Sequence, residues 1–281
     1  MRIVVTGGAG RLGRALLPEL QSNHDVLVFD QTRPADSTGV RVRLGDHRDL
    51  GQVAGALKGA DLVVHLSAIT YPGLYSEEVQ FAANVIGAFN VAEAAELVGI
   101  PKLVFASSPS PLGFMAPRDT FRITYLPIDE DHPLLPHNAY GLSKLVTEEI
   151  LKAWQRRTGG SAIVIRPCYI LAPEEWEERG RTRLENPNLA AGNLFNYVDV
   201  RDAAQAFRLA AEGELPGYNV FFAGAPDALA QEPLADLFPR YYPGTEKMAA
   251  CLTGTRPAIS NARAEAVLGY RPQFSWRNLL A

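Results

Sequence analysis

Tyr140 and Lys144 are the pair of residues in this sequence whose types and spacing most directly suggest chemistry. They lie four residues apart, and on an α-helix this spacing places two side chains on the same face. A phenol ionises near pH ~10, and an ammonium group held beside it favours the phenolate and lowers that pKa. The pair could therefore act as a general acid/base that moves a proton on or off a hydroxyl group. The alternative is an exposed pair of side chains on a helix surface.

The elements that would position this pair follow an alternating pattern of short apolar runs and helical stretches. The runs that we expect to form strands cover residues 3–5, 26–29, 40–44, 62–66, 103–106, 163–165 and 219–222. Helical patterns begin near Leu12, Asp49, Glu77 and Tyr140, and a further one covers residues 203–211. This alternation predicts an α/β fold, a Rossmann-like doubly wound parallel sheet with helices on both faces.

The expected organisation is one integrated unit, because the sequence contains no repeat and no low-complexity linker. We expect a nucleotide-binding core over residues 1–166, completed by residues 197–223. Residues 167–196 and 224–281 would form a small C-terminal substrate-binding lobe. Within this lobe the charged segment 173–193 is expected to be a solvated loop, with a lid that closes over substrate as the alternative.

Composition excludes several classes of partner. The chain has 281 residues and a formal net charge of -4, so it has no basic footprint for nucleic acid, and we expect a small-molecule substrate. Two cysteines, Cys168 and Cys251, predict neither a disulfide framework nor a zinc site, and the five histidines show no metal-ligand spacing. We find no signal-like segment and no apolar run long enough to span a bilayer, which predicts a cytoplasmic protein that binds no membrane.

A glycine-rich turn follows the first expected strand, in the run Thr6-Gly-Gly-Ala-Gly-Arg-Leu-Gly13. Gly7, Gly10 and Gly13 permit a tight turn, close approach of a pyrophosphate and close packing of helix on strand. The helix N-terminus that follows would face the negative charge. We therefore expect the turn, including Arg11 and Leu12, to bind a dinucleotide, although a glycine triplet alone can simply mark a tight turn.

Acidic residues after the second and third strands suggest how the protein recognises its cofactor. Asp30 could accept hydrogen bonds from the ribose hydroxyls and repel a 2′-phosphate, which favours NAD. Arg33 lies close enough to pair with a phosphate, so NADP remains a minority alternative. Asp46 could accept from the adenine amino group, or it could cap the helix that begins near Asp49.

The fourth expected strand ends in the run His65-Leu66-Ser67-Ala68. Small residues at this point let the backbone pass close to a cofactor bound at the sheet edge. We include the whole run among the expected cofactor contacts.

Together these features resemble the extended short-chain dehydrogenase/reductase family, specifically its NAD-dependent epimerase/dehydratase branch. The resemblance covers most of the chain. It rests on the glycine turn, Asp30, the runs 44–46, 65–68, 84–87 and 105–108, Tyr140 with Lys144, Arg166-Pro167 and the run 197–199. These ordered motifs are specific for fold and cofactor and much less specific for substrate.

The resemblance implies roles for individual residues. It makes Tyr140 the catalytic acid/base, with Lys144 lowering its pKa and holding the nicotinamide ribose. It makes Ser108 the catalytic serine that orients the reacting oxygen, with Ser107 and Ser110 as alternatives, either of which could instead cap a turn. By analogy Asn84 supports the lysine or a bound water, unless it is only an amide on a helix surface.

The segment after Arg166 is where the resemblance bears on both cofactor and substrate. Residues 167–170 would back the nicotinamide ring, with Pro167 as a cofactor contact and Cys168 as a packing residue. The stretch from Arg166 to Tyr197 is shorter than in family members that act on nucleotide sugars, and is more like that of small sugar-acid dehydrogenases. Arg179, Arg181 and Arg183 could bind phosphate or carboxylate, with surface placement as the alternative.

The residues that would read the substrate lie in segments that depart from the family pattern, at 70–76, 109–125, 172–193 and in the last third of the chain. The substrate contacts that we expect are Thr70, Ser108, Ser110 and Tyr169. They do not choose among a sugar acid, a free sugar, a nucleotide sugar or another alcohol.

We expect an NAD-dependent oxidoreductase in which Tyr140 removes a hydroxyl proton as hydride leaves the same carbon. The alternatives are a nucleotide-sugar 4-epimerase with tightly bound NAD and, from another class, a non-catalytic dinucleotide sensor. A homodimer is compatible with apolar stripes on the helices over residues 77–97 and 140–154, but packing against the sheet explains such stripes equally well.

Overall fold

The structure is a computed structural model that describes residues 1–35, 39–70, 75–114 and 121–280. Residues 71–74 and 115–120, which belong to two of the segments expected to read the substrate, therefore lie outside the described residues.

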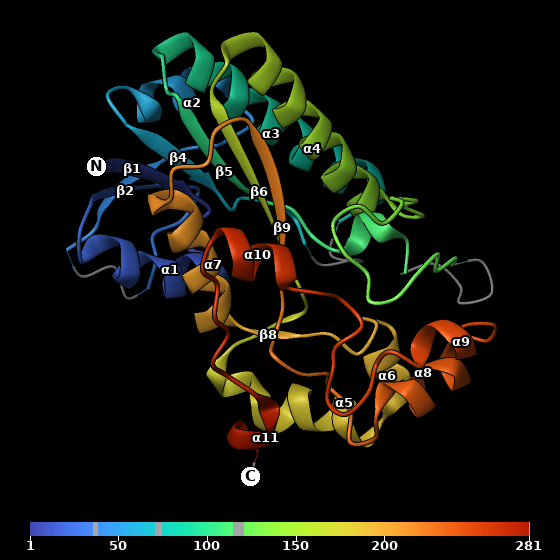
Figure 1. The fold of residues 1–281 in the computed structure, drawn as a ribbon. Coiled ribbons are helices and arrows are strands. Elements are labelled where there is room, and N and C mark those ends of the chain that lie inside the picture. The colour runs from blue at the N-terminus through green and yellow to red at the C-terminus, as the bar shows by residue number, and fades with distance from the viewer. Residues whose placement is uncertain (36–38, 71–74, 115–120, 281) are drawn as a thin grey trace. The chain divides into compact units, whose positions relative to one another are not determined.

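A seven-stranded sheet forms the centre of the fold, as the alternation of apolar runs predicts (Figure 1). Its strand order is β3-β2-β1-β4-β5-β6-β9, and the pairs from β3 to β6 are parallel. The strands are β1 (Arg2–Thr6), β2 (Asp25–Asp30), β3 (Arg41–Leu44), β4 (Leu62–His65), β5 (Lys102–Ala106), β6 (Ser161–Pro167) and β9 (Tyr218–Ala223). The order reverses between β1 and β4, and ligands of such sheets bind at this switch point, beyond the carboxyl ends of the strands.

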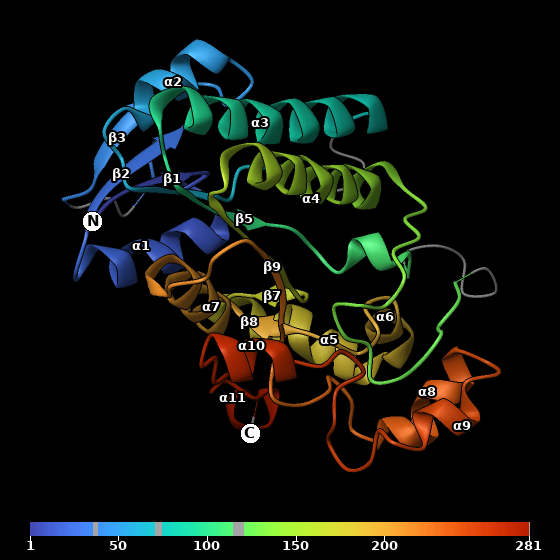
Figure 2. The same cartoon turned by 45° about the horizontal axis from the view of Figure 1, so that its top comes forward.

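Helices cover both faces of the sheet, so the prediction of a doubly wound α/β fold is confirmed (Figure 2). The helices on one face are α2 (Leu50–Leu57), α3 (Glu77–Val98) and α4 (Ala139–Thr158). On the other face lie α1 (Arg11–Gln21) and α7 (Val200–Glu212), joined by an ion pair of 2.9 Å between Arg208 and Glu19.

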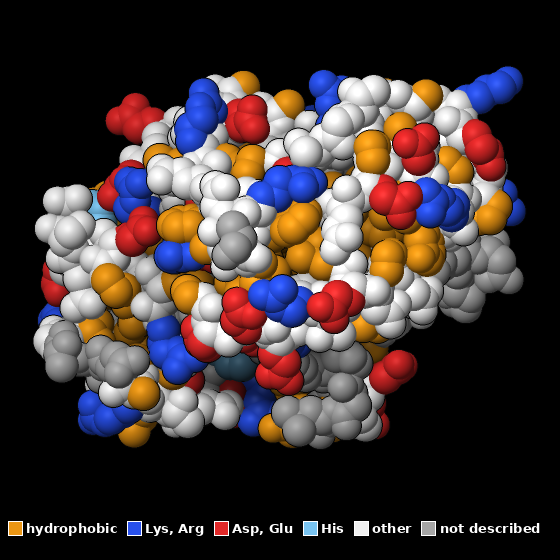
Figure 3. All heavy atoms as spheres, turned by 90° about the horizontal axis from the view of Figure 1, so that it is seen from below, with side chains coloured by type: hydrophobic (Ala, Val, Ile, Leu, Met, Phe, Trp, Pro, Cys, Tyr) orange, Lys and Arg blue, Asp and Glu red, His pale blue; other side chains and the backbone are white. Residues whose placement is uncertain are grey.

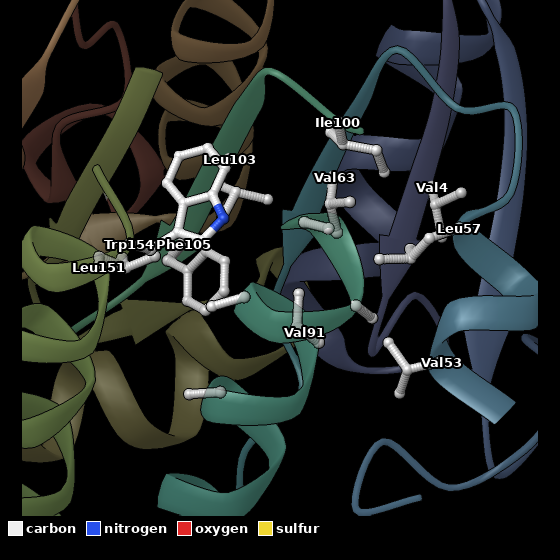
Figure 4. Packing of buried hydrophobic residues seen from close by; sticks show 14 of the residues in the cluster. Val4, Val53, Leu57, Val63, Val91, Ile100, Leu103, Phe105, Leu151 and Trp154 are labelled. Atoms are coloured by element: carbon white, nitrogen blue, oxygen red, sulfur yellow. The ribbon is translucent and has the colours of Figure 1, made fainter. Parts of the chain in front are cut away.

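The core beneath α2, α3 and α4 is apolar and closed to solvent (Figure 4). Strand residues such as Val63 and Phe105 pack against helix residues such as Val53, Val91 and Trp154, all of them buried. Strands covered on both faces must be apolar throughout, which explains why they appear in the sequence as continuous rather than alternating runs.

Helix α3 differs from the expectation that no segment is apolar and long enough to span a bilayer. Its 22 residues meet that test by length and composition. The helix packs against α2 and α4, and buries residues such as Ala88 and Val91 in the core. Its N-terminus is capped by Ser76, and Gly99 ends it in the left-handed conformation (φ 77°). These features are typical of a core helix in a folded domain.

The segment 173–193 is not the solvated loop that its charges suggested. It forms short helical turns over Pro173–Glu175 and Trp176–Gly180 and the helices α5 (Arg181–Glu185) and α6 (Pro187–Ala191). Trp176 and Leu184 are buried in a second apolar cluster with Tyr197, and the Trp176 indole donates to Asp199 at 2.9 Å. The prediction failed because these two apolar side chains suffice to anchor the segment while its charges pair with one another on the outside. The lid alternative stays a prediction.

Two compact units make up the chain. The first contains Met1–Ser107, Ala139–Ile165 and Ala204–Val220, and the second contains Ser108–Asn138, Arg166–Ala203 and Phe221–Ala281. The second unit includes the paired strands β7 (Ile170–Leu171) and β8 (Val198–Asp199), and the helices α8 (Leu234–Tyr241), α9 (Glu246–Ala249), α10 (Ala262–Val267) and α11 (Trp276–Leu279). Residues 108–138 belong to this second unit, whereas the sequence predicted them as part of the nucleotide-binding core.

Charged side chains of both signs are interspersed over the face shown in Figure 3, with hydrophobic side chains between them. In the second unit several charged side chains form ion pairs, such as Arg181 with Glu177 at 2.8 Å. A mixed surface of this kind agrees with the near-neutral composition of the chain.

Replacement of Gly13 by alanine tests the packing of α1 against the glycine turn. A Cβ atom there would lie 2.5 Å from the carbonyl oxygen of Gly8, so the backbone has to move. We expect Gly13→Ala to lower the free energy of unfolding by about 1–3 kcal/mol in urea titrations. The control Gly51→Ala, at an exposed position of α2 where the nearest atom to the added Cβ lies at 3.4 Å, should be neutral or stabilising. Equal stabilities of the two variants would contradict the close packing.

Candidate functional site

The N-terminal turns of α4 hold Tyr140 and Lys144 together in a buried setting. Lys144 is only 4% exposed, and its Nζ lies 5.8 Å from the centre of the Tyr140 ring. The same Nζ donates a hydrogen bond of 2.8 Å to the carbonyl oxygen of Ala106, at the end of β5. The alternative of an exposed surface pair is therefore wrong.

Two positive charges act on the Tyr140 phenol, the ammonium of Lys144 and the positive end of the α4 dipole. Burial lowers the pKa of Lys144 to about 8, and this value still leaves the side chain mostly charged at neutral pH. Tyr140 also lies in the first turn of α4, where the helix dipole presents its positive end. Both the ammonium and the dipole favour the phenolate, which is the form that can accept a proton.

A chain of polar contacts holds this turn of α4 in place. The Ser143 hydroxyl donates to the carbonyl oxygen of Tyr140 at 2.7 Å, and the Asn84 amide donates to the Ser143 hydroxyl at 3.1 Å. Asn84 also pairs with both backbone groups of Ile69, in the segment that follows β4. Asn84 is buried, so the alternative of a surface amide is wrong, and its observed contacts position α4 rather than the lysine directly.

Sequence reasoning did not single out Ser143 for any role. A serine three residues after the tyrosine was the available signal, because helical serines often bond back to the preceding turn.

The three candidate serines make different contacts. The Ser107 hydroxyl donates to Glu148 at 2.6 Å, which commits it to holding α4 against the end of β5. In the second unit the Ser108 hydroxyl lies 2.9 Å from that of Ser110 and accepts a hydrogen bond from the Ser110 backbone N–H at 3.1 Å. The assignment of Ser108 as the oxygen-orienting residue stays a prediction, and Ser107 is the least available of the three.

A cavity of about 440 Å³ opens at the switch point of the sheet. Its walls come from the glycine turn, the end of β2, the loop after β3, the segment after β4 and α3. The lining residues expected from the sequence are Gly7, Gly10, Asp30, Leu66, Ser67 and Ala68. A Cβ atom on Gly7, whose φ is 74°, would lie 2.6 Å from the backbone nitrogen of Ser67, so only glycine permits this approach.

Asp30 presents its carboxylate at this cavity. One oxygen accepts from the backbone N–H of Ala9 at 3.0 Å and the other from that of Thr32 at 3.2 Å. These bonds fix the carboxylate beside the glycine turn, where it can also accept from ribose hydroxyls. Arg33, whose proximity in sequence left NADP open, is exposed and does not line the cavity.

Asp46 does not cap α2, and its expected contact with adenine stays a prediction. Its carboxylate binds Arg48, with contacts between 2.5 and 3.0 Å, and this hydrogen bonding lowers the pKa of Asp46 to about 2. The cap of α2 is instead Asp49, which accepts from the backbone N–H of Gln52 at 2.9 Å. Asp46 itself does not line the cavity, although the neighbouring residues Gly45 and His47 do.

The residue after Asp46, His47, lines the cavity, and sequence reasoning missed it. Its ring lies against α3 at Gly87, where an added Cβ atom would come within 1.8 Å of the imidazole. Its position just beyond the carboxyl end of β3 was the signal that could have identified it.

His65 is a core residue rather than a cofactor contact. Its Nδ1 lies 2.6 Å from the Thr6 hydroxyl and its ring lies 4.6 Å from that of Phe105. Burial holds the pKa of His65 well below its usual value, so the ring is neutral. The other three residues of the run 65–68 line the cavity.

The other predicted cofactor contacts do not line the cavity. Arg11, Leu12 and Gly13 form the first turn of α1, and Gly13 acts through close packing on the glycine turn. Pro167 ends β6 in the second unit and is buried. Cys168 is buried as well, which raises its thiol pKa to about 12, so it is a packing residue as expected and not a nucleophile.

The predicted substrate contacts Thr70 and Tyr169 have different environments. Thr70 is exposed. The Tyr169 hydroxyl is buried without a hydrogen-bond partner among the described residues, and the Arg183 guanidinium lies 4.1 Å from the ring centre. Arg179 and Arg181 pair with Glu175 and Glu177, as the surface alternative expected.

Known proteins with similar sequences share the cofactor-binding part of the chain. Residues 3–221 match the model of the NAD dependent epimerase/dehydratase family. An L-arabinose 1-dehydrogenase (NAD(P)(+)) of Haloferax volcanii is 30% identical over 220 residues, which cover 76% of this chain and 84% of the relative. A putative UDP-glucose 4-epimerase of Methanocaldococcus jannaschii is 32% identical over 211 residues, or 70% of this chain and 62% of that protein. A uronate dehydrogenase of Pseudomonas syringae pv. tomato is 29% identical over 168 residues, or 59% and 58%.

A solved structure with the same fold is that of a short-chain dehydrogenase/reductase superfamily protein from Agrobacterium tumefaciens with bound NAD. It is 26% identical to this chain, with a TM-score of 0.76, and the match covers 100% of this chain and 95% of that one.

Replacement of Asp30 tests how the cavity selects its ligand. Asp30→Ala removes a fixed acceptor for ribose hydroxyls and a charge that repels a 2′-phosphate. We expect NAD to bind at least about 10-fold more weakly in calorimetric titrations, while the relative affinity for NADP rises. Asp25→Ala removes the same charge from the exposed start of the same strand and should leave both affinities unchanged. Unaltered NAD binding by Asp30→Ala would exclude the role of this carboxylate.

Proposed function

The chain belongs to the NAD dependent epimerase/dehydratase family, and on this premise we propose that it is an NAD-dependent oxidoreductase. The proposed reaction oxidises a hydroxyl-bearing carbon of a sugar or a sugar-acid-like substrate. The observation that carries it is the buried Lys144 beside Tyr140 on a helix of the same unit that holds the nucleotide cavity.

The cavity has the features that NAD requires. The glycine turn leaves its backbone open at Gly7 and Gly10, the N-terminus of α1 follows, and Asp30 faces the place of a ribose. When bound, NAD supplies the hydride acceptor for the oxidation. Glycines whose added Cβ atoms would strike neighbouring backbone are the structural reason to place the cofactor here.

The protein's own contribution is the transfer of a proton. In the proposed reaction the Tyr140 phenolate accepts the hydroxyl proton of the substrate as the carbon is oxidised. Lys144 holds the phenolate form by its charge, and the Asn84–Ser143 contacts keep the first turns of α4 in place.

Relatives support a sugar or a sugar acid as the substrate. The relatives named above include an L-arabinose dehydrogenase and a uronate dehydrogenase. The short stretch between Arg166 and Tyr197 favours such small substrates over nucleotide sugars. The second candidate function is a nucleotide-sugar 4-epimerase with tightly bound NAD, which the similarity to the putative UDP-glucose 4-epimerase favours.

We further propose that the protein forms a homodimer through α3 and α4. Val79, Ile86 and Phe89 share one face of α3 by their spacing, and each is more than 40% exposed. Leu142 of α4, the helix packed against α3, is equally exposed. Large apolar side chains gathered on two adjacent helices are typical of an interface.

Replacement of Tyr140 by phenylalanine tests the proposed reaction. The purified protein is mixed with NAD and a panel that contains L-arabinose, uronates and UDP-glucose, and nicotinamide reduction is followed by absorbance. We expect NADH to accumulate with at least one sugar or sugar acid, and Tyr140→Phe to lower the rate by at least about 100-fold. NAD binding should not change, because the phenol does not line the described cavity.

Tyr241→Phe serves as the control, because it removes a phenol from the second unit and should retain full turnover. Full turnover in Tyr140→Phe would contradict the assignment of the acid/base. Conversion of UDP-glucose without net NADH would favour the epimerase.

Replacement of Phe89 by glutamate tests the dimer. A charge on the apolar α3 face opposes its burial, so Phe89→Glu should be monomeric in light scattering where the wild type is dimeric. Val267→Glu places the same charge at an exposed apolar position in the second unit and should remain dimeric. A monomeric wild type, or a dimeric Phe89→Glu, would refute this interface.

A further inference from the structure

Glu148 is a buried carboxylate that the proposed reaction does not yet use. It lies four residues after Lys144 on α4, so the two side chains share a helix face. Glu148 is 1% exposed, and burial of a carboxylate without strong partners is unfavourable. A glutamate at this position therefore needs an explanation beyond helix formation.

Glu148 and Lys144 make parallel contacts with the end of β5. Lys144 donates to the carbonyl oxygen of Ala106 at 2.8 Å, and the hydroxyl of the next residue, Ser107, donates to Glu148 Oε1 at 2.6 Å. Successive turns of α4 thus bind successive residues at the point where β5 ends. Ser107 directly precedes Ser108, the serine that the family resemblance makes catalytic.

Further titratable groups near this pair come from the neighbouring strands and from α4 itself. Tyr218 of β9 donates to Glu148 Oε2 at a long 3.5 Å, and the Lys152 ammonium lies 5.3 Å from the centre of the Tyr218 ring. His65 of β4 is close enough to Lys144 for the ammonium charge to help lower the pKa of His65, whose ring is neutral. Among these described groups, Glu148 is the one that supplies negative charge to Lys144.

The electrostatic effects on Lys144 oppose each other. Burial lowers its pKa, and the negative charge of Glu148 raises it, with a net value of about 8. Without that charge burial would act unopposed, and Lys144 would lose its proton closer to neutral pH. A neutral lysine would no longer stabilise the Tyr140 phenolate.

We propose that Glu148 is a positioning residue of the proton-transfer site: its charge holds Lys144 in the ammonium form, and its bond to Ser107 fixes α4 to the end of β5. This inference rests on the proposed function for its consequence in catalysis. The effect of the Glu148 charge on the pKa of Lys144 can be measured without any substrate.

The experiment follows the ionisation of Lys144 in the full chain with NAD bound. Lysines labelled with ¹³C at Cε are titrated by NMR, and the resonance of Lys144 is assigned by its absence in Lys144→Met. In Glu148→Gln, which preserves shape and an acceptor for Ser107, the midpoint of Lys144 should fall by about one pH unit. Glu149→Gln removes the same charge from the adjacent, exposed position, where Glu149 pairs with Lys152, and should leave the midpoint unchanged.

A midpoint in Glu148→Gln equal to that of the wild type would overturn the proposal, whatever the outcome of the Tyr140 test. If Glu148→Gln does not fold, Glu148→Asp decides, because it retains the charge. Glu148→Asp should retain a midpoint near the wild-type value, and a fall of about one unit there would show that the charge is not the cause.

Once the panel has provided a substrate, turnover gives a second measurement. The alkaline limb of the kcat profile should move to lower pH in Glu148→Gln and not in Glu149→Gln, with circular dichroism as the check on folding. An unmoved alkaline limb in folded Glu148→Gln would contradict a role in proton transfer and leave Glu148 a purely structural residue.

Discussion

The buried ammonium of Lys144 is the constraint on which much of the first unit depends. A charge removed from water is tolerated only where acceptors replace its hydration. Here the replacements come from the end of β5, through the Ala106 carbonyl, and from α4 itself. These contacts with Lys144 form only if α4 keeps one position along β5. The hydrogen bonds of Ser107 and Asn84 hold α4 in that position. The position of the charged Lys144 beside Tyr140 therefore depends on how α4 packs against β5.

The nucleotide cavity depends on a different physical principle, the exclusion of side chains. Gly7 approaches the backbone after β4 so closely that a methyl group would not fit, and Gly13 brings α1 against the turn in the same way. Close packing of this kind leaves an open backbone beside the N-terminus of α1 and the Asp30 carboxylate. A glycine turn, a helix N-terminus and a carboxylate at the switch point are the features by which such sheets bind dinucleotides.

Sequence reasoning succeeded where a local pattern has a single physical solution. Continuous apolar runs identified the strands, and the glycine spacing identified the turn, because few other structures accommodate either pattern. It failed where long-range contacts decide, as for His65, whose ring packs between β1 and β5. The prediction for the segment 173–193 was wrong for a related reason, because Trp176 and Leu184 are buried against residues from other parts of the chain. His47 and Ser143 were missed because single polar residues carry no periodic signal.

The division of the chain bears on how the protein folds. Each unit consists of three separate stretches, so neither is complete until residues far apart in sequence have met. Such a topology has a high contact order, and folding rates fall as contact order rises. During synthesis β1 to β6 emerge before α7 and β9, so the edge of β6 that β9 will cover is exposed for a time. An uncovered strand edge promotes association with other chains, and this stage is where the nascent protein would most need a chaperone.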